Sequence, residues 1–161
     1  MDERDVIALE LCSVTRENWR DAMRLKVHPE QMRFIAEVEP IALLVLAKAF
    51  VGVMGHIWTP YTFMAGNEMV GFAALSYDPR GATECWVHHF FIDAAHQGRG
   101  YGQQALALII EVARATEPRR LACYLTVHAE NATAQRLYAR AGFMPTGETM
   151  FGDPLYKLAL P

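Results

Sequence analysis

Short apolar runs bounded by turn residues recur along the chain and predict strands. Two of these runs, Tyr61 to Ala65 and Met69 to Tyr77, flank Gly66-Asn67, a residue pair that favours a tight hairpin turn. We therefore expect these runs to pair as neighbouring antiparallel strands. Cys85 to Ile92 is expected to form the central strand. Further strands are expected at residues 7–14, 121–127 and 155–160.

Segments with helical periodicity alternate with these strands. Residues 103–115 carry one apolar stripe that can pack on a sheet, formed by Leu106, Ile109, Ile110 and Ala113. Residues 131–141 are expected to form a second amphipathic helix, with Asn131 as a favourable N-cap and Gly142 favourable just past its end. Other helices are expected at residues 18–27 and from about residue 41. The alternation predicts an α/β layered domain.

The segment from Ile41 to Trp58 is apolar enough to resemble a membrane span. It is interrupted by Lys48, Gly52, Gly55 and His56. Because a span needs about 20 mostly apolar residues, we expect a buried helix that breaks near Gly52 to Gly55, and no membrane association. Part of this segment is also a candidate dimer face.

The composition indicates a single globular domain over residues 1–161. Of the 161 residues, 52% are hydrophobic and 20% are charged, so the chain can bury a sizeable core. The net charge of −3 excludes a broad basic face for nucleic acid. Three cysteines without C-x-x-C spacing predict reduced thiols rather than a metal site. Since Met1 to Asp5 is charged and lacks the apolar core of a signal peptide, we expect a cytoplasmic protein.

The glycine-rich stretch from Gln97 to Gly102 follows the central strand and precedes the helix at residues 103–115. A strand, a glycine-rich turn and a helix N-terminus together form a cradle for an anion such as a nucleotide pyrophosphate. The glycine spacing matches neither the dinucleotide fingerprint nor a P-loop, which needs a Gly-Lys-Ser/Thr triplet. An ordinary tight turn is the alternative interpretation.

Two motifs, one at residues 97–102 and a second at residues 131–143, resemble the signatures of the GCN5-related N-acetyltransferase (GNAT) superfamily and occur in the same order. The stretch Gln97-Gly98-Arg99-Gly100-Tyr101-Gly102 resembles its Q/R-x-x-G-x-G/A loop, which binds the pyrophosphate of acyl-CoA. The run Asn131-x6-Tyr138-x3-Gly142-Phe143 resembles a second signature, in which the asparagine helps to hold the cofactor and the tyrosine faces its sulfur. The stretch Trp86-x3-Phe90-Phe91-Ile92-Asp93 is similar to the bacterial polyamine or diamine N-acetyltransferase branch.

This resemblance implies a mixed, largely antiparallel central sheet flanked by helices, in which a splayed pair of parallel strands binds acyl-CoA. It also implies acetyl-CoA as co-substrate, no metal, and a homodimer. The residues expected to contact the cofactor are Phe90, Phe91, Ile92, Gln97, Gly98, Arg99, Gly100, Tyr101, Gly102, Gln103, Asn131 and Tyr138.

Acylation of an amine requires an alkylammonium group, with a reference pKa of about 10.4, to lose a proton before it attacks the thioester. His88 is the candidate base. Strand alternation is expected to place it on the same face as Phe90 and His89 on the other face. The resemblance agrees, because relatives carry Glu, Asp or His nine residues before the equivalent of Gln97. A half-buried histidine without catalytic duty, or an ordered water acting as base, stays open as an alternative.

The resemblance assigns Tyr138 as the residue that assists the departing CoA thiolate, in a direct transfer within a ternary complex. Polyamine enzymes of this branch line the acceptor groove with carboxylates, so the candidate acceptor-site residues are Glu37, Glu39, Trp86 and His88. The apolar stretch from Ile41 to Leu46 departs from that branch. The acceptor is therefore open between a polyamine or diamine and an arylalkylamine, amino acid or peptide N-terminus. A catalytically silent acyl-CoA-binding or dimerisation module is the alternative from another functional class.

Overall fold

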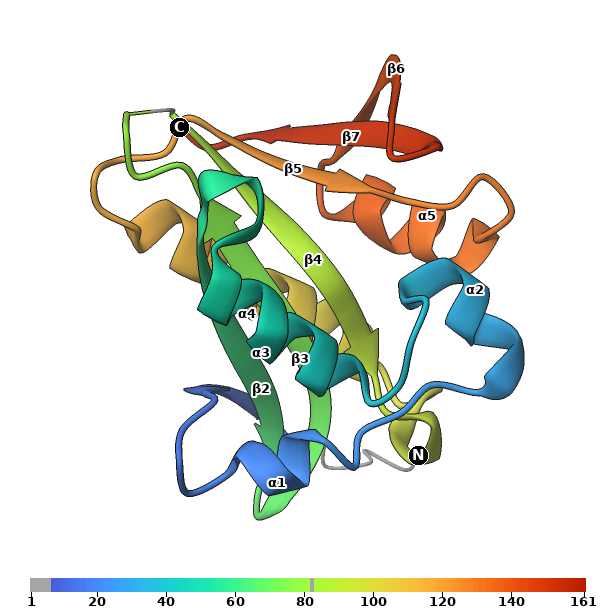
Figure 1. The fold of residues 1–161 in the computed structure, drawn as a ribbon. Coiled ribbons are helices and arrows are strands. Elements are labelled where there is room, and N and C mark those ends of the chain that lie inside the picture. Colours follow the sequence, from blue (N-terminus) through green and yellow to red (C-terminus); the bar gives the residue numbers. More distant parts are fainter. Residues whose placement is uncertain (1–6, 82) are drawn as a thin grey trace.

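The computed structural model describes residues 7–81 and 83–161. Met1 to Asp5, on which the cytoplasmic prediction depends, lies outside these residues. One seven-stranded sheet runs through the molecule in the order β1-β2-β3-β4-β5-β7-β6 (Figure 1). Its strands are β1 (Leu9–Ser13), β2 (Ile57–Ala65), β3 (Glu68–Tyr77), β4 (Glu84–Ile92), β5 (Ala122–Thr126), β6 (Met144–Met150) and β7 (Asp153–Ala159). Only the pairing of β4 with β5 is parallel in the described chain.

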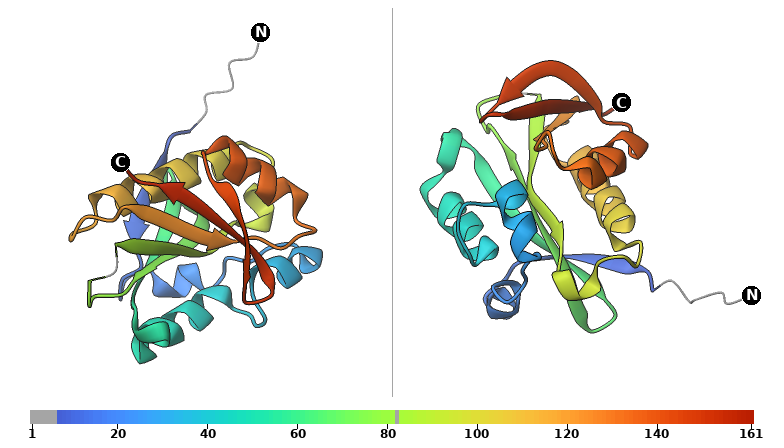
Figure 2. Two further views of the ribbon diagram at one scale, coloured as in Figure 1. Left: turned by 90° about the horizontal axis from the view of Figure 1, so that it is seen from above. Right: turned by 90° about the vertical axis from the view of Figure 1, so that its right-hand side faces the viewer.

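Helices cover both faces of this sheet. They are α1 (Trp19–Ala22), α2 (Met32–Ile35), α3 (Ile41–Val51), α4 (Tyr101–Ala115) and α5 (Ala132–Arg140), with 3-10 turns η1 (Pro29–Gln31), η2 (Val53–Gly55) and η3 (Ala94–His96). The right-hand view of Figure 2 shows α3 on one side of the sheet and α4 with α5 on the other. The expected α/β layered domain, with its largely antiparallel sheet, is confirmed.

Two buried clusters fill the layers. On the α4 side, the predicted stripe of Leu106, Ile109 and Ile110 packs against strand residues such as Val87. On the α3 side, Ile41 and Val45 belong to a smaller cluster with Trp58 and Phe91 of the sheet. Burial of these apolar side chains stabilises the central strands from both faces, against α4 on one face and α3 on the other.

The strands β4 and β5 pair along only part of their length. Glu84 pairs with Ala122, Cys85 with Cys123 and Trp86 with Tyr124. Beyond that point the strands diverge, and β4 continues to Ile92 without β5 beside it (Figure 1). The predicted splayed pair of parallel strands is therefore confirmed. Backbone groups of β4 on its β5 side are left available to a ligand in the opening.

The apolar segment at residues 41–58 breaks where the sequence predicted. α3 ends at Gly52, which adopts a left-handed conformation with φ of 65°, and η2 follows. Within the described residues, no helix has both the length and the apolar character needed to cross a membrane. The expectation that the helix is buried holds only for one face, because Phe50 is 92% exposed and Val51 is 68% exposed.

Three elements differ from the sequence prediction. α1 covers only Trp19–Ala22 rather than residues 18–27, and the chain beyond it is extended where it approaches Pro29, as residues before proline prefer. β2 begins at Ile57, four residues early. Its Pro60 is tolerated because the Pro60 carbonyl faces Val14, so the missing N–H lies on the side where β1 has ended. β6 was not predicted, since nearly all of its side chains are exposed.

Candidate active site

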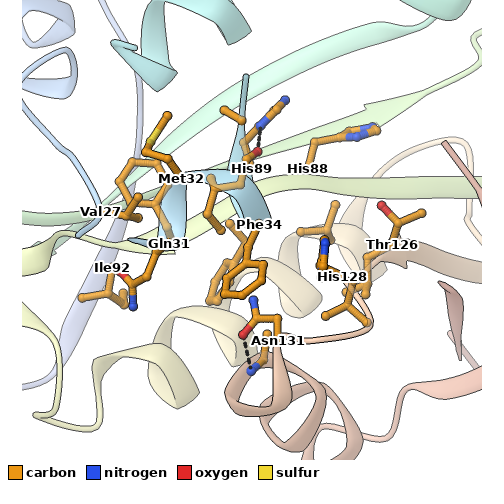
Figure 3. A pocket seen from close by; sticks show the side chains of 18 of the residues that line it. Val27, Gln31, Met32, Phe34, His88, His89, Ile92, Thr126, His128 and Asn131 are labelled. Carbon is orange, nitrogen blue, oxygen red and sulfur yellow. Dashed lines mark hydrogen bonds between the residues drawn. The ribbon is translucent and has the colours of Figure 1, made fainter. Parts of the chain in front are cut away.

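A cavity of 1170 Å³ occupies the opening between β4 and β5 and continues towards α2, α3 and the start of α4. It joins sequence segments that are far apart, as the close view in Figure 3 shows. The predicted site residues that line it are Glu37, His88, Phe90, Phe91, Ile92, Gln97, Gly98, Gly100, Tyr101, Gly102, Asn131 and Tyr138. Cofactor-site, catalytic and acceptor-site candidates therefore share one continuous space.

The glycine-rich turn forms one end of this cavity. Gly98 and Gly100 have φ of 77° and 79°, a conformation that L side chains rarely adopt, and a Cβ on either would meet nothing within 4 Å. Gly100 is the N-cap of α4, a 15-residue helix whose first amides lack partners within the helix. The open space, the amides and the positive end of the helix dipole together suit a pyrophosphate.

Hydrogen bonds hold the side chain of Gln97 away from the glycine-rich turn, so the turn presents its backbone to the cavity. Its amide nitrogen donates to the carbonyl of Ile92 at 3.0 Å and to Oε1 of Gln31 at 2.9 Å. In return, Nε2 of Gln31 donates to Oε1 of Gln97 at 3.0 Å. This reciprocal amide pair ties η1 to the turn. Sequence reasoning missed it because the two residues are 66 positions apart.

The α5 wall carries Asn131 and Tyr138. Oδ1 of Asn131 accepts a hydrogen bond from the backbone N–H of Ala134 at 3.2 Å (Figure 3), so its side-chain NH₂ is the group left for a ligand. The Tyr138 ring lies 6.3 Å from Phe90 and 5.9 Å from Phe143. Burial raises the pKa of the Tyr138 phenol well above its ordinary value of 10.0, so the hydroxyl stays protonated.

The two histidines of β4 correct a sequence prediction. His89 has φ of 49°, and the register of β3 against β4 shifts at this point. A bulge of this kind interrupts the two-residue alternation of side chains. As a result both histidines lie on the α3 side of the sheet, whereas Phe90 lies in the α4-side core. The expectation that His88 shares a face with Phe90 is therefore wrong. His89 does lie on the face opposite Phe90, as expected, but His88 lies there as well.

His88 is partly buried between aromatic and polar neighbours. Its ring stacks on Trp58 with 4.2 Å between centroids, and its Nε2 is 2.8 Å from Oγ of Ser76. Burial and the nearby His89, Lys48 and His56 lower the pKa of His88 to about 3. The imidazole is therefore neutral at physiological pH and can accept a proton, but it holds a positive charge poorly.

His89 is fixed in one tautomer. Its Nδ1 lies 2.8 Å from the carbonyl of Ile35, which can only accept, so Nδ1 carries the hydrogen. Nε2 then accepts a hydrogen bond from Nζ of Lys48 at 3.0 Å. Burial first and then Lys48 lower the pKa of His89 to about 4. The Lys48 ammonium also lies over the Trp58 ring, 5.5 Å from its centroid.

Lys48 is a functional candidate that sequence reasoning treated only as an interruption of an apolar segment. It projects from α3 onto the cavity wall, where burial lowers its pKa and Glu37 opposes that shift. A single cation within an apolar helix was the available signal. The cavity wall near the histidines therefore carries a lysine and a carboxylate together.

Four predicted site residues are not on the cavity wall. They are Arg99, Gln103, Glu39 and Trp86. Arg99 and Gln103 are exposed in and just after the glycine-rich turn, and Glu39 is exposed just before α3. Trp86 is buried and stacks on Tyr124 with 5.1 Å between centroids, and its ring lies 6.3 Å from that of His88.

The open parallel strand pair, the anion cradle at the start of α4 and the buried tyrosine on α5 define an acyl-CoA-dependent transferase. The profile of the acetyltransferase (GNAT) family matches residues 15–143. The chain therefore belongs to the GNAT family of acetyltransferases. It is an N-acetyltransferase that uses acetyl-CoA as its co-substrate.

Individual relatives share most of the chain. The spermine/spermidine N(1)-acetyltransferase of Bacillus subtilis is 30% identical over 151 residues, which cover 90% of this chain and 93% of the relative. Among solved structures, the Vibrio cholerae spermidine N-acetyltransferase in complex with CoA and spermine superposes with a TM-score of 0.74. It is 17% identical and covers 95% of this chain and 96% of its own.

An acetyltransferase of Salmonella typhimurium that modifies the N-terminal serine of ribosomal protein L7/L12 has a similar fold. Its TM-score is 0.72 at 16% identity, with 96% of each chain covered. Both structural matches share the architecture of this chain, and their acceptors differ from each other.

Proposed function

We propose that this chain acetylates a primary amine of a small molecule by direct transfer from acetyl-CoA in a ternary complex. The observation that supports this most directly is the single cavity that reaches from the anion cradle, past Tyr138, to His88 and Lys48. Acetyl-CoA enters with its pyrophosphate at Gly98 to Gly100 and its pantetheine arm along the opening between β4 and β5. The acceptor then approaches from the side of α2 and α3.

His88 is the proposed acceptor of the amine proton. The nitrogen lone pair attacks the thioester carbonyl carbon, and the carbon–sulfur bond breaks to release CoA as its thiolate. Moving a proton from an alkylammonium with a pKa of about 10.4 to an imidazole with a pKa of about 3 is uphill by about 10 kcal/mol. His88 is therefore expected to pass the proton on rather than to store it.

Tyr138 is proposed to stabilise the leaving thiolate. Because burial raises its pKa, a full proton transfer to a thiolate with a reference pKa of about 8.5 is unfavourable. A hydrogen bond from the phenol to the developing thiolate requires no such transfer. The backbone N–H groups of β4 near Phe90 to Ile92 supply the corresponding donors for the carbonyl oxygen.

The acceptor class has two candidates. The first is a diamine or polyamine, which the Bacillus subtilis relative acetylates according to its name and for which Glu37 offers a carboxylate. The second is an amine that also carries an anionic group, such as an amino acid or a peptide N-terminus. Lys48 favours this second class, because its ammonium lies on the cavity wall beside Trp58 and His89, where it would repel a polycation.

The test is CoA thiol release from acetyl-CoA against a panel of amines: spermidine, putrescine, arylalkylamines, amino acids and short peptides. Amine-dependent release that falls in His88→Gln and Tyr138→Phe supports the proposal, and the amine that is used identifies the acceptor class. CoA binding without release from any amine would favour a silent acyl-CoA-binding module instead.

We also propose that the enzyme is cytoplasmic and forms a homodimer. The homodimer is supported by a group of exposed apolar side chains on α3, η2 and the start of β2. They are Leu43, Phe50, Val51, Met54 and Ile57. A stretch of chain with several exposed large apolar side chains is a candidate for an interface between subunits, which would remove them from water.

A further inference from the structure

A chain of hydrogen bonds leads from the candidate active site away from the cavity. Oγ of Ser76 lies 2.8 Å from Nε2 of His88 and 3.0 Å from Nδ1 of His56. The three residues come from β4, β3 and the end of η2, and the cavity wall includes only His88. Ser76 has no exposed surface, so its hydroxyl joins the two imidazoles without a competing water at its own position.

The hydroxyl of Ser76 determines which imidazole donates a hydrogen bond and which accepts one. It has one hydrogen and accepts through its lone pairs, so it cannot donate to both rings at once. When it donates to one imidazole, the other must donate to it. The arrangement has two states of equal bonding, which differ by the position of one hydrogen on each ring. Within the described chain Nδ1 of His88 has no hydrogen-bond partner, and it is the ring nitrogen available to a substrate.

His88 and His56, the two ends of this series of hydrogen bonds, lie in different electrostatic surroundings. His88 faces the Lys48 ammonium, His89 and His56, and these groups all oppose a positive charge on its ring. Burial also lowers the pKa of His56, but His56 is less buried than His88, and the carboxylate of Asp78 opposes that shift while the guanidinium of Arg80 adds to it. A proton is therefore held more easily at His56 than at His88.

We propose that His56 and Ser76 form a proton relay that carries the amine proton from His88 to solvent. The proton of the alkylammonium forms a bond to Nδ1 of His88. The Nε2 proton of His88 moves to Oγ of Ser76, and the Ser76 hydroxyl proton moves to Nδ1 of His56. The Nε2 proton of His56 is released to water.

These proton transfers balance, and they leave no positive charge on His88 at the active site. One proton leaves the amine and one enters solvent, while both imidazoles end neutral in the opposite tautomer and return through water once product leaves. A relay also removes the need for a stable imidazolium at His88, beside Lys48. The inference rests on the proposed role of His88 as base, and it adds two residues to the reaction that do not touch either substrate.

The relay is tested with Ser76→Ala and His56→Gln, with Thr62→Val as a matched control. Thr62 is another fully buried hydroxyl of the same sheet, bonded to the Cys12 carbonyl and absent from the cavity wall. The relay predicts that kcat/KM for the amine falls by about 100-fold or more in each relay variant, as expected for loss of a proton-transfer group, while CoA affinity stays unchanged. Thr62→Val should retain the wild-type value.

Two further readouts separate a relay from a structural role. In mixtures of H₂O and D₂O, the rate of the wild type should depend on deuterium fraction along a curve, because several protons move together, whereas Ser76→Ala should give a straight line. Added imidazole should restore activity to His56→Ala and not to Ser76→Ala. His56 is only partly buried, so its variants stay informative if Ser76→Ala fails to fold.

Wild-type kcat/KM in both Ser76→Ala and His56→Gln, together with an inactive His88→Gln, would overturn the relay and leave the proposed base in place. Full activity in His88→Gln would overturn the base and the relay together.

Discussion

The hydroxyl of Tyr138 is the most direct single-residue test of the transfer step, because Tyr138 lines the cavity. Tyr138→Phe keeps the ring against Phe90 and Phe143 and removes only the proposed donor to the thiolate. We expect kcat to fall by about 100-fold with little change in the KM for acetyl-CoA, because the hydrogen bond forms as charge develops. Steady-state kinetics measures both constants. The same change at Tyr156, a partly buried tyrosine of β7 packed on the same core, should leave kcat unchanged. Equal losses in the two variants would contradict the assignment.

The low pKa values of His88 and His89 also predict how stability depends on pH. Both are depressed in the native state, to about 3 and about 4, from an ordinary value of 6.5. Below about pH 6.5 the unfolded chain binds protons that the native protein excludes, so stability is lost as pH falls through this window. Between neutral pH and about pH 5 each histidine should contribute a loss of about 2 kcal/mol.

Urea unfolding of the wild type and of a His88→Gln, His89→Gln double variant at several pH values measures this effect. The double variant should show a flatter dependence below about pH 6.5. If both proteins lose stability in parallel, the two imidazoles are not the groups that exclude protons.

At the scale of elements, the proposed binding of pyrophosphate by the backbone of the turn before α4 can be tested at the glycines of that turn. Gly100→Ala forces a side chain into a left-handed conformation without a steric clash, and this costs about 1 kcal/mol. Gly66, in the hairpin between β2 and β3, has φ of 59° and is equally open. We expect both alanine variants to lose similar stability. Only Gly100→Ala should weaken CoA binding, because relief of the strain in the free protein would move the turn out of its binding conformation. If the full cost of about 1 kcal/mol is lost on binding, affinity falls about 5-fold.

Thermal unfolding and calorimetric titration with CoA provide the two measurements. A similar loss of CoA affinity in Gly66→Ala would mean that the effect follows stability rather than the position of the turn.

Elements with strong local signals were predictable from sequence, and those set by tertiary contacts were not. The apolar stripe and the capping residues of α4 and α5 identify these helices directly. β6 offers no such signal, because it is an exposed edge strand that depends on pairing with β7. For α1 the sequence predicted too long a helix. Leu25 and Val27 are apolar and buried in the α3-side core, but they are not helical.

The same division holds for the site. The turn at Gln97 to Gly102 and Tyr138 could be predicted because their motifs resemble the GNAT signatures, and the structure places most of the predicted set around one cavity. The bulge at His89 could not be predicted from the sequence, because it arises from the register between β3 and β4. Ser76 and His56 acquire a candidate role only through contacts across strands, which no local pattern reveals.

For the whole molecule, the proposed homodimer makes the exposed face of α3 the part to test. Phe50 is 92% exposed and has Val51 and Leu43 on the same helix, so a charge there would be buried in the interface and unpaired. We expect the wild type to sediment as a dimer and Phe50→Lys as a monomer. Met144→Lys is the matched control, because Met144 is 67% exposed on β6, at the edge of the sheet, and its variant should remain dimeric.

Sedimentation equilibrium over a range of protein concentrations distinguishes the possible results. Dissociation by Met144→Lys and not by Phe50→Lys would move the interface to the β6 edge. A monomeric wild type at all concentrations would contradict the homodimer itself. If Phe50→Lys is monomeric and retains kcat, each subunit carries a complete active site. That outcome is expected, because the glycine-rich turn, Tyr138 and His88 all line one cavity within a single chain.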